Sequence, residues 1–128
     1  MLKTGILNPQ INSLLARIRH TNTLVLADRG FPFWPHIETI DISLIDDVPT
    51  VPQLLAAIQQ NWTIGRIWMA EEFREHNTPE TISRLNSLVA ADITYEPHIQ
   101  FKLRVPQAIG LIRTGDTTQY ANMILVSA

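Results

Sequence analysis

The stretch of sequence that decides the fold is residues 108–126, AIGLIRTGDTTQYANMILV. Two apolar runs, 108–112 and 120–126, flank the polar segment 113–119, which contains a glycine. Apolar runs of this length, bounded by turn-forming residues, are typical of buried strands. The stretch therefore predicts two buried strands joined by a tight connection.

Two polar side chains stand at the start of the second of these strands. Buried strands usually begin with an apolar residue, whereas this one begins with Tyr120 and continues to Asn122. Residues two apart point to the same face of a strand, so the phenol and the carboxamide are directed together. Such a pair binds hydroxyl groups well. A polar edge that only closes a hairpin explains the same residues, and the stretch by itself leaves both interpretations open.

Apolar strands and amphipathic helices alternate along the rest of the chain. The expected elements, in order, are a helix capped by Asn8 or Asn12 and ending near residue 20, strands over 23–27 and 37–42, a helix over 51–60, a strand over 64–70, a helix from 79 to about 90, and a short strand over 93–95. Residues 96–105 fit either a helical turn or a strand. This alternation predicts a three-layer α/β/α fold, a single domain over 1–128 with a mostly parallel, mixed central sheet.

The composition excludes several classes of function. The chain has 128 residues, 45% of them hydrophobic and 17% charged, which fits one globular domain with a genuine core. Its net charge is -2 and its basic residues are scattered, so it carries no footprint for nucleic acid or an anionic membrane. It has no cysteine and no apolar run near the ~20 residues that span a bilayer. We expect a cytoplasmic protein with neither nucleic acid nor membrane as a partner.

Common catalytic motifs are absent from the chain. No glycine-rich phosphate loop, dinucleotide fingerprint, nucleophile elbow or zinc-binding helix motif occurs. The histidines are too widely spaced to suggest a metal site; they are His20, His36, His76 and His98. The sequence therefore gives no support for redox, phosphoryl-transfer or metal-dependent hydrolytic chemistry. Acid–base work on a neutral, hydroxyl-rich ligand, or simple binding, remains, and we expect no cofactor.

Several polar residues at predicted element ends each allow a functional and a structural interpretation. His20 follows the first helix, whose last carbonyls stabilise an imidazolium. Asp28 follows the buried strand 23–27, the usual place of a site in an open α/β sheet. His98 and Lys102 share a face if their segment is helical. Taken one at a time, these residues are more often a helix cap, a turn residue and a solvated pair.

A set of dispersed motifs runs through the chain in a fixed order. The motifs are Gly5-Ile6-Leu7-Asn8, His20-Thr21, Leu26-Ala27-Asp28 with Gly30 and Pro32, Ile40-Asp41-Ile42-Ser43-Leu44 with Pro49, Phe101-Lys102-Leu103, Ile112-Arg113-Thr114-Gly115, and Tyr120-Ala121-Asn122. This ordered set resembles the D-ribose pyranase and L-fucose mutarotase family. The opening motif is similar to the ribose branch, and the resemblance runs nearly end to end.

The resemblance implies a cofactor-independent sugar mutarotase, which interconverts pyranose, furanose and anomeric forms of a monosaccharide such as D-ribose. It implies that His20 is the general acid, and it assigns sugar contacts to Asp28, His98, Lys102, Tyr120, Ala121 and Asn122. It also implies a homo-oligomer, a decameric ring with sites between subunits. Ring opening delivers a proton to the ring oxygen and removes one from the anomeric hydroxyl, which suits a histidine because it titrates near neutrality.

The predicted strand 23–27 separates His20 from Asp28. Five strand residues at ~3.3 Å each place its two ends roughly 16 Å apart. One small sugar does not bridge that distance. Both residues can therefore serve one site only if His20 comes from a neighbouring copy of the chain.

Two alternatives to a ribose mutarotase stay open. The first is a non-catalytic sugar-binding or assembly protein on the same fold. Arg19, where family members often have glycine, and the bulky aromatic segment 31–34 favour this alternative. Those aromatic side chains can stack on a sugar, pack against a neighbouring subunit or fill the core, and the last two uses are commoner. The second alternative is a mutarotase for fucose or another hexose.

The acidic residues Glu71 and Glu72, together with His76, follow the predicted strand 64–70. They are expected to lie in a solvated loop.

Overall fold

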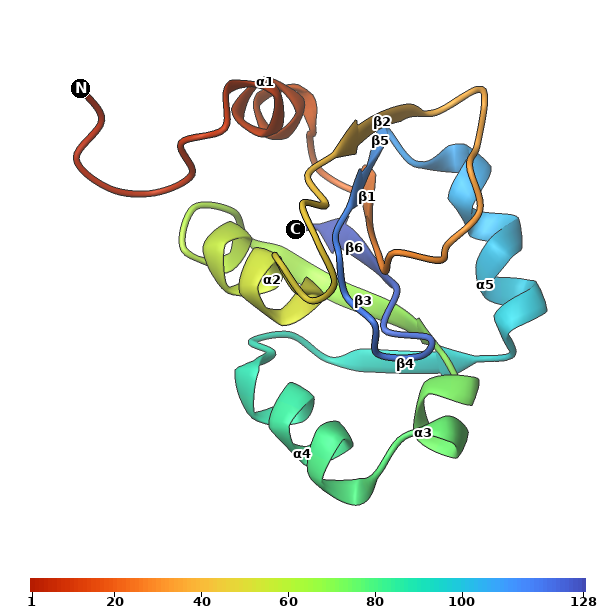
Figure 1. Cartoon of the computed structure of the whole chain (residues 1–128). Helices are drawn as coiled ribbons and strands as arrows, with labels where there is room; N and C mark the ends of the chain where they lie inside the picture. The colour runs from red at the N-terminus through yellow and green to blue at the C-terminus, as the bar shows by residue number, and fades with distance from the viewer.

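The computed structural model describes residues 1–128 and contains one mixed six-stranded sheet with helices against both faces (Figure 1). The elements are α1 (Pro9–Arg17), β1 (Thr23–Ala27), β2 (Glu38–Asp41), α2 (Val51–Gln59), β3 (Ile64–Ala70), α3 (Glu72–His76), α4 (Pro79–Leu88), β4 (Ile93–Glu96), α5 (His98–Arg104), a 3-10 turn (Val105–Gln107), β5 (Gly110–Arg113) and β6 (Met123–Ser127). The strand order is β2-β5-β1-β6-β3-β4. Strand β6 is antiparallel to both its neighbours, and the other pairings are parallel. The predicted α/β class with a mostly parallel, mixed sheet is confirmed.

The longer helices begin where their cap residues predict. Asn8, Thr50 and Thr78 each accept a hydrogen bond from a first-turn amide, and a proline stands in the first turn of each helix. A side-chain cap satisfies an amide that has no intrahelical partner, and proline is tolerated there because it lacks that amide. None of the helices of this chain has the length and apolar character needed to cross a membrane.

The sheet separates two apolar cores of unequal size. In β1, Leu24 and Leu26 point into the larger core, whereas Val25 and Ala27 point into the smaller one. Helices α1 and α2 cover the larger core, and α5 covers the smaller one from the other side of the sheet (Figure 1). This alternation along a strand buried on both faces explains the continuous apolar run of its sequence.

Both strands predicted from residues 108–126 exist, as β5 and β6, but they do not pair with each other in a hairpin. Strand β1 lies between β5 and β6 and pairs with both, so the expected tight connection is wrong. The polar segment crosses the end of β1 instead, where the Arg29 amide donates to the Asp116 carbonyl at 3.0 Å. Strand β6 begins only at Met123, and Tyr120 has a left-handed backbone with φ 56°. The turn, rather than strand alternation, therefore directs Tyr120.

Two helices resolve or correct the sequence predictions. The ambiguous residues 96–105 form α5 and the turn that follows it. The segment expected to be a solvated loop contains α3, with Phe73 only 1% exposed. A helix of five residues with one core contact shows no apolar periodicity, which is why the sequence did not reveal it.

Helix α4 buries less than its pattern predicts. The apolar residues Ile82, Leu85, Leu88 and Val89 recur at the helical spacing expected for a buried face, but only Leu85 is buried, and Leu88 is 43% exposed. The helix packs mainly on α2 and α3 rather than on the sheet, and Ile82 and Val89 are only partly buried against the core.

Candidate functional site

The strand directions bring several chain segments to one edge of the sheet. The carboxyl ends of the five strands β1 to β5 meet there with the amino end of the antiparallel β6. We call this the carboxyl edge and the opposite one the amino edge. Asp28 directly follows β1, His98 begins the helix after β4, and Tyr120 and Asn122 precede β6. Open α/β sheets place ligand sites at this edge because loops from separate strands converge on it.

A cavity of about 340 Å³ lies at the carboxyl edge. Its lining comes from three separate parts of the chain, namely residues 28–32, His98, and the segment 116–122 without Ala121. Only two of the lining residues are hydrophobic. A cavity lined in this way suits a small molecule rich in hydroxyl groups.

Asp28 and Asn122 form a reciprocal pair at the cavity wall. The Asn122 carboxamide, 3% exposed, accepts from the Asp28 amide at 2.8 Å and donates to the Asp28 carboxylate at 2.9 Å. The Gly30 amide donates to the other carboxylate oxygen at 2.9 Å. Burial raises the pKa of the Asp28 carboxyl, although these hydrogen bonds oppose the shift. These hydrogen bonds fix the orientation of the carboxylate, which is positioned to accept a hydrogen bond from a hydroxyl group of a ligand.

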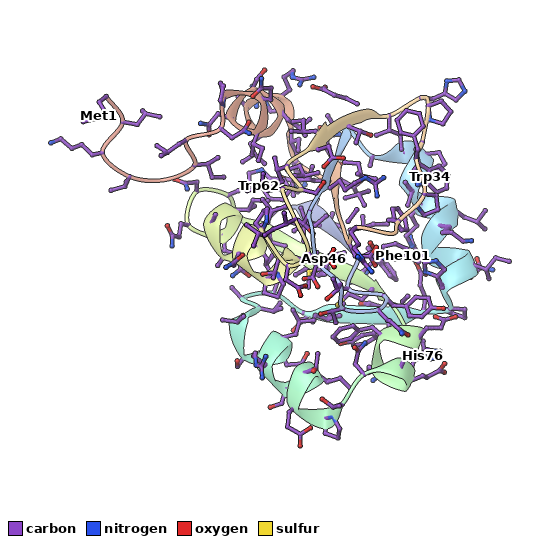
Figure 2. All side chains as sticks on the ribbon, viewed as in Figure 1. Met1, Trp34, Asp46, Trp62, His76 and Phe101 are labelled. Atoms are coloured by element: carbon purple, nitrogen blue, oxygen red, sulfur yellow. The ribbon has the colours of Figure 1, made fainter.

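The Tyr120 ring contacts two imidazoles. His76 stacks on it with ring centroids 5.3 Å apart, and His98 meets it edge-on at 5.1 Å. Figure 2 labels His76 on α3, the helix that follows β3 at this edge. The left-handed backbone of Tyr120 is uncommon for a large side chain, so these contacts hold an orientation that the local sequence does not favour.

His98 lines the cavity, and one of its ring nitrogens is buried. Its Nδ1 is buried and has no hydrogen-bond partner within the chain. Burial lowers the pKa of His98, the nearby Lys102 ammonium acts in the same direction, and Glu72 and Asp28 oppose the shift. The imidazole therefore stays neutral to lower pH than an exposed histidine, and a neutral ring offers one donor and one acceptor nitrogen.

Two of the predicted sugar-contact residues do not line this cavity. Ala121 is buried in the larger core and faces a neighbouring cavity instead. Lys102 lies one helical turn beyond His98 and influences it through charge. Within the chain, no three His, Asp or Glu side chains are placed to hold a metal ion together.

His20 lies at the amino edge, away from the cavity. It is exposed, and the following Thr21 amide donates to the carbonyl of Ser127, the last residue of β6. The whole of β1 separates it from Asp28, in agreement with the roughly 16 Å expected from strand geometry. One copy of the chain therefore brings together Asp28, Tyr120 and Asn122 with His98, but not His20.

Asp46 and Asp47 contact residues of the cavity rim, a role that the sequence did not suggest. Asp47 accepts hydrogen bonds from the Thr117 amide at 2.9 Å and from its hydroxyl at 2.8 Å, and these donors lower the pKa of Asp47. Asp46 pairs with Arg29 at 2.6 Å. Both Thr117 and Arg29 line the cavity, so one acidic loop braces two parts of its rim. The adjacent acids in the sequence were the only signal of this contact.

The fold and the cavity define a class, a small α/β protein with a polar pocket for a neutral, hydroxyl-bearing molecule. Residues 1–128 match the model of the RbsD / FucU transport protein family, and the chain belongs to that family. It is 39% identical to a D-ribose pyranase of Geobacillus kaustophilus, over 99% of this chain and 93% of that protein. It is 36% identical to a D-ribose pyranase of Corynebacterium glutamicum, over 99% and 97% respectively.

Solved structures show the same architecture. The structure of Bacillus subtilis RbsD complexed with D-ribose superposes with a TM-score of 0.92 at 34% identity, covering 100% of this chain and 98% of that one. A fucose mutarotase from Streptococcus pneumoniae, in complex with L-fucose, gives a TM-score of 0.80 at 23% identity, covering 99% and 98%. At that lower identity the likeness shows the fold alone.

Proposed function

We propose that residues 1–128 form one mutarotase domain, a cofactor-independent isomerase of the D-ribose pyranase type. The observation that carries the proposal is the cavity at the carboxyl edge, which the paired Asp28 and Asn122 line together with Tyr120 and His98. Full-length identity of 39% to a D-ribose pyranase supports the same activity. The substrate is a monosaccharide, with D-ribose preferred over L-fucose.

The proposed chemistry follows from the side chains at this edge. The fixed carboxylate of Asp28 accepts a sugar hydroxyl, and the Asn122 carboxamide holds that carboxylate in place. Tyr120 and His98 bind further hydroxyls, Lys102 adds charge nearby, and Ala121 contributes only its backbone. Opening the cyclic hemiacetal protonates the ring oxygen and deprotonates the anomeric hydroxyl, and reclosure of the free aldehyde gives the other ring form.

The proposal assigns the acid to His20 of a neighbouring copy of the chain. His20 is exposed at the amino edge, and no lining residue of the cavity comes from that edge. A ring of copies that docks the amino edge of one against the carboxyl edge of the next completes each site. The family resemblance implies a cytoplasmic decamer.

Exchange NMR on D-ribose and L-fucose tests the activity. Micromolar protein is expected to speed the interconversion of ribose ring forms, with a smaller effect on fucose. Signals that broaden on binding, with unchanged exchange, would instead support a sugar-binding protein on the same fold. A preference for fucose would move the chain to the other branch of the family.

Mixing two inactive variants tests the shared site. His20→Ala keeps the cavity, and Asn122→Ala keeps His20, so each alone is expected to lose exchange activity. Copies mixed after dissociation and reassembly should recover about a quarter of wild-type activity, because half the cavities are intact and half of those face an intact His20. A mixture that stays inactive contradicts a site shared between copies.

A further inference from the structure

Arg113, the last residue of β5, directs its guanidinium at a ring of backbone carbonyls. Its Nη1 donates to the carbonyl of Phe31 at 2.6 Å and makes longer contacts with those of Asp28 at 3.4 Å and Arg29 at 3.5 Å. Its Nη2 donates to the Pro32 carbonyl at 3.2 Å. The side chain is 12% exposed. Four carbonyls of the loop that follows β1 thus converge on one cation.

The geometry requires arginine rather than any cation. Converging carbonyl dipoles repel one another, so a donor with several N–H groups must lie between them. A guanidinium offers five donors in a fixed plane, whereas a lysine ammonium is a compact charge that does not span the same set. The nearest carboxylate, Asp41, is 3.9 Å from Nε, and its Oδ1 accepts from Ser43. Arg113 is therefore held mainly by the loop, with a weak ion pair.

We propose that Arg113 is the positioning residue of the sugar-binding loop 28–32, an inference that rests on the proposed function. This loop forms one wall of the cavity and begins with Asp28. Its internal hydrogen bonds are few: the Gly30 amide donates to the Asp28 carboxylate, and the Phe31 amide makes a long bond of 3.5 Å to the Asp28 carbonyl. The guanidinium therefore fixes the peptide that orients the Asp28 carboxylate.

The alternative role for Arg113 is a structural ion pair at the sheet edge. The two roles differ in the partner through which Arg113 acts, either the carbonyls of loop 28–32 or the carboxylate of Asp41. If Arg113 acts through the loop carbonyls, removing the charge of Asp41 leaves sugar binding unchanged. If it acts through the ion pair, Asp41→Asn weakens binding as much as a change at Arg113 itself.

The test measures D-ribose affinity and the exchange rate at saturating sugar for Arg113→Lys, Asp41→Asn and the control Arg17→Lys. Arg17 forms an exposed pair with Glu38 at 2.8 Å and lies outside the cavity. Arg113→Lys is expected to weaken ribose binding about tenfold, because several charge-assisted hydrogen bonds are lost. Its saturating rate should stay within about threefold of wild type, because the acid at His20 is untouched. The other two variants should match wild type.

Three results overturn the inference: a folded Arg113→Lys protein that binds ribose as tightly as wild type, an Asp41→Asn protein that is weakened equally, or an Arg113→Lys chain that fails to fold. The last result would make Arg113 a residue of global stability. Failure of the proposed function is distinct, because wild type itself would then neither bind nor interconvert the sugars. Faster amide hydrogen exchange of Arg29, Gly30 and Phe31 in Arg113→Lys would still support the positioning of the loop in that case, and unchanged exchange would overturn it.

Discussion

The two edges of the sheet differ in how far their polar side chains are held by hydrogen bonds and packing. At the carboxyl edge, Asp28 and Asn122 are joined by hydrogen bonds, and Tyr120 lies against His76 and His98. At the amino edge, His20 stands exposed after the end of α1. The carboxyl edge holds a cavity whose side chains are fixed by one another, whereas His20 at the amino edge is exposed.

This difference follows from the direction of the strands. Because only β6 runs against the others, six segments that leave or enter strands meet at the carboxyl edge. Their side chains can therefore fix one another, as Asn122 fixes Asp28. In the proposed enzyme, binding and proton transfer belong to opposite edges and can be removed separately.

The largest effect is expected from His20→Ala. Removing a general acid should slow ring exchange by ~100–10,000-fold. D-ribose affinity should stay within about twofold of wild type, because no cavity residue changes. Exchange NMR and calorimetric titration measure the two quantities. His36→Ala, at another exposed histidine outside the cavity, serves as the control and should change neither. Loss of binding in His20→Ala would contradict the separation of the edges.

Asn122→Ala should damage the carboxyl edge most strongly. It leaves the Asp28 amide and carboxylate without their partner in a nearly buried place, so the free energy of unfolding should fall by about 2–4 kcal/mol. Sugar binding should weaken with it. Urea denaturation measures the first effect. Asn86→Ala, on the exposed face of α4, is the control and should change stability by less than about 0.5 kcal/mol. Equal effects of the two changes would refute the role of the pair.

His76→Ala should have a smaller effect, confined to binding. Without the stacked imidazole, the Tyr120 ring loses about 0.5–1.5 kcal/mol of contact, and the Michaelis constant for D-ribose should rise about threefold to tenfold. The saturating exchange rate should hardly change. His76→Phe keeps a stacking ring and should restore affinity, and Glu75→Ala on the same helix is the control. If His76→Phe fails to restore binding, stacking is not the reason.

The smallest effect concerns the pH dependence of stability. Folding lowers the pKa of His98. As the pH falls, the imidazole of His98 is therefore protonated in the unfolded chain before it is protonated in the folded one. The stability from a neutral His98 is fully present above its ordinary pKa of about 6.5 and is lost as the pH falls below that value. Wild type should therefore lose more unfolding free energy between about pH 8 and pH 5 than His98→Asn. Parallel pH profiles would show that His98 does not titrate in this way.

Local patterns were sufficient where neighbouring residues decide the structure. Strands 23–27 and 64–70 have the predicted bounds. The apolar run of 23–27 needs burial on both faces, which only the interior of a sheet provides. The helix starts at residues 51 and 79 were also predicted, and Asn8 is the one of the two expected caps that the first helix uses. A cap is visible in the sequence because it satisfies amides only a few residues away. Placing Asp28 after a buried strand located the cavity edge for the same reason.

Features set by distant contacts were not accessible from the sequence. No local pattern shows that β1 separates β5 from β6, because strand order depends on pairing across most of the chain. Helix α3 depends on the burial of Phe73, and through that helix His76 reaches Tyr120. The carbonyls around Arg113 likewise come from a loop more than eighty positions earlier in the chain.

The sequence by itself determined the class of fold, the main elements and the separation of His20 from Asp28 by the length of one strand. Only the tertiary structure decided which side chains share the cavity and how each is held. The physical reason is that a strand or a helix cap is stabilised by its own neighbours, whereas the direction of a polar side chain depends on hydrogen bonds and packing from segments far apart in the sequence.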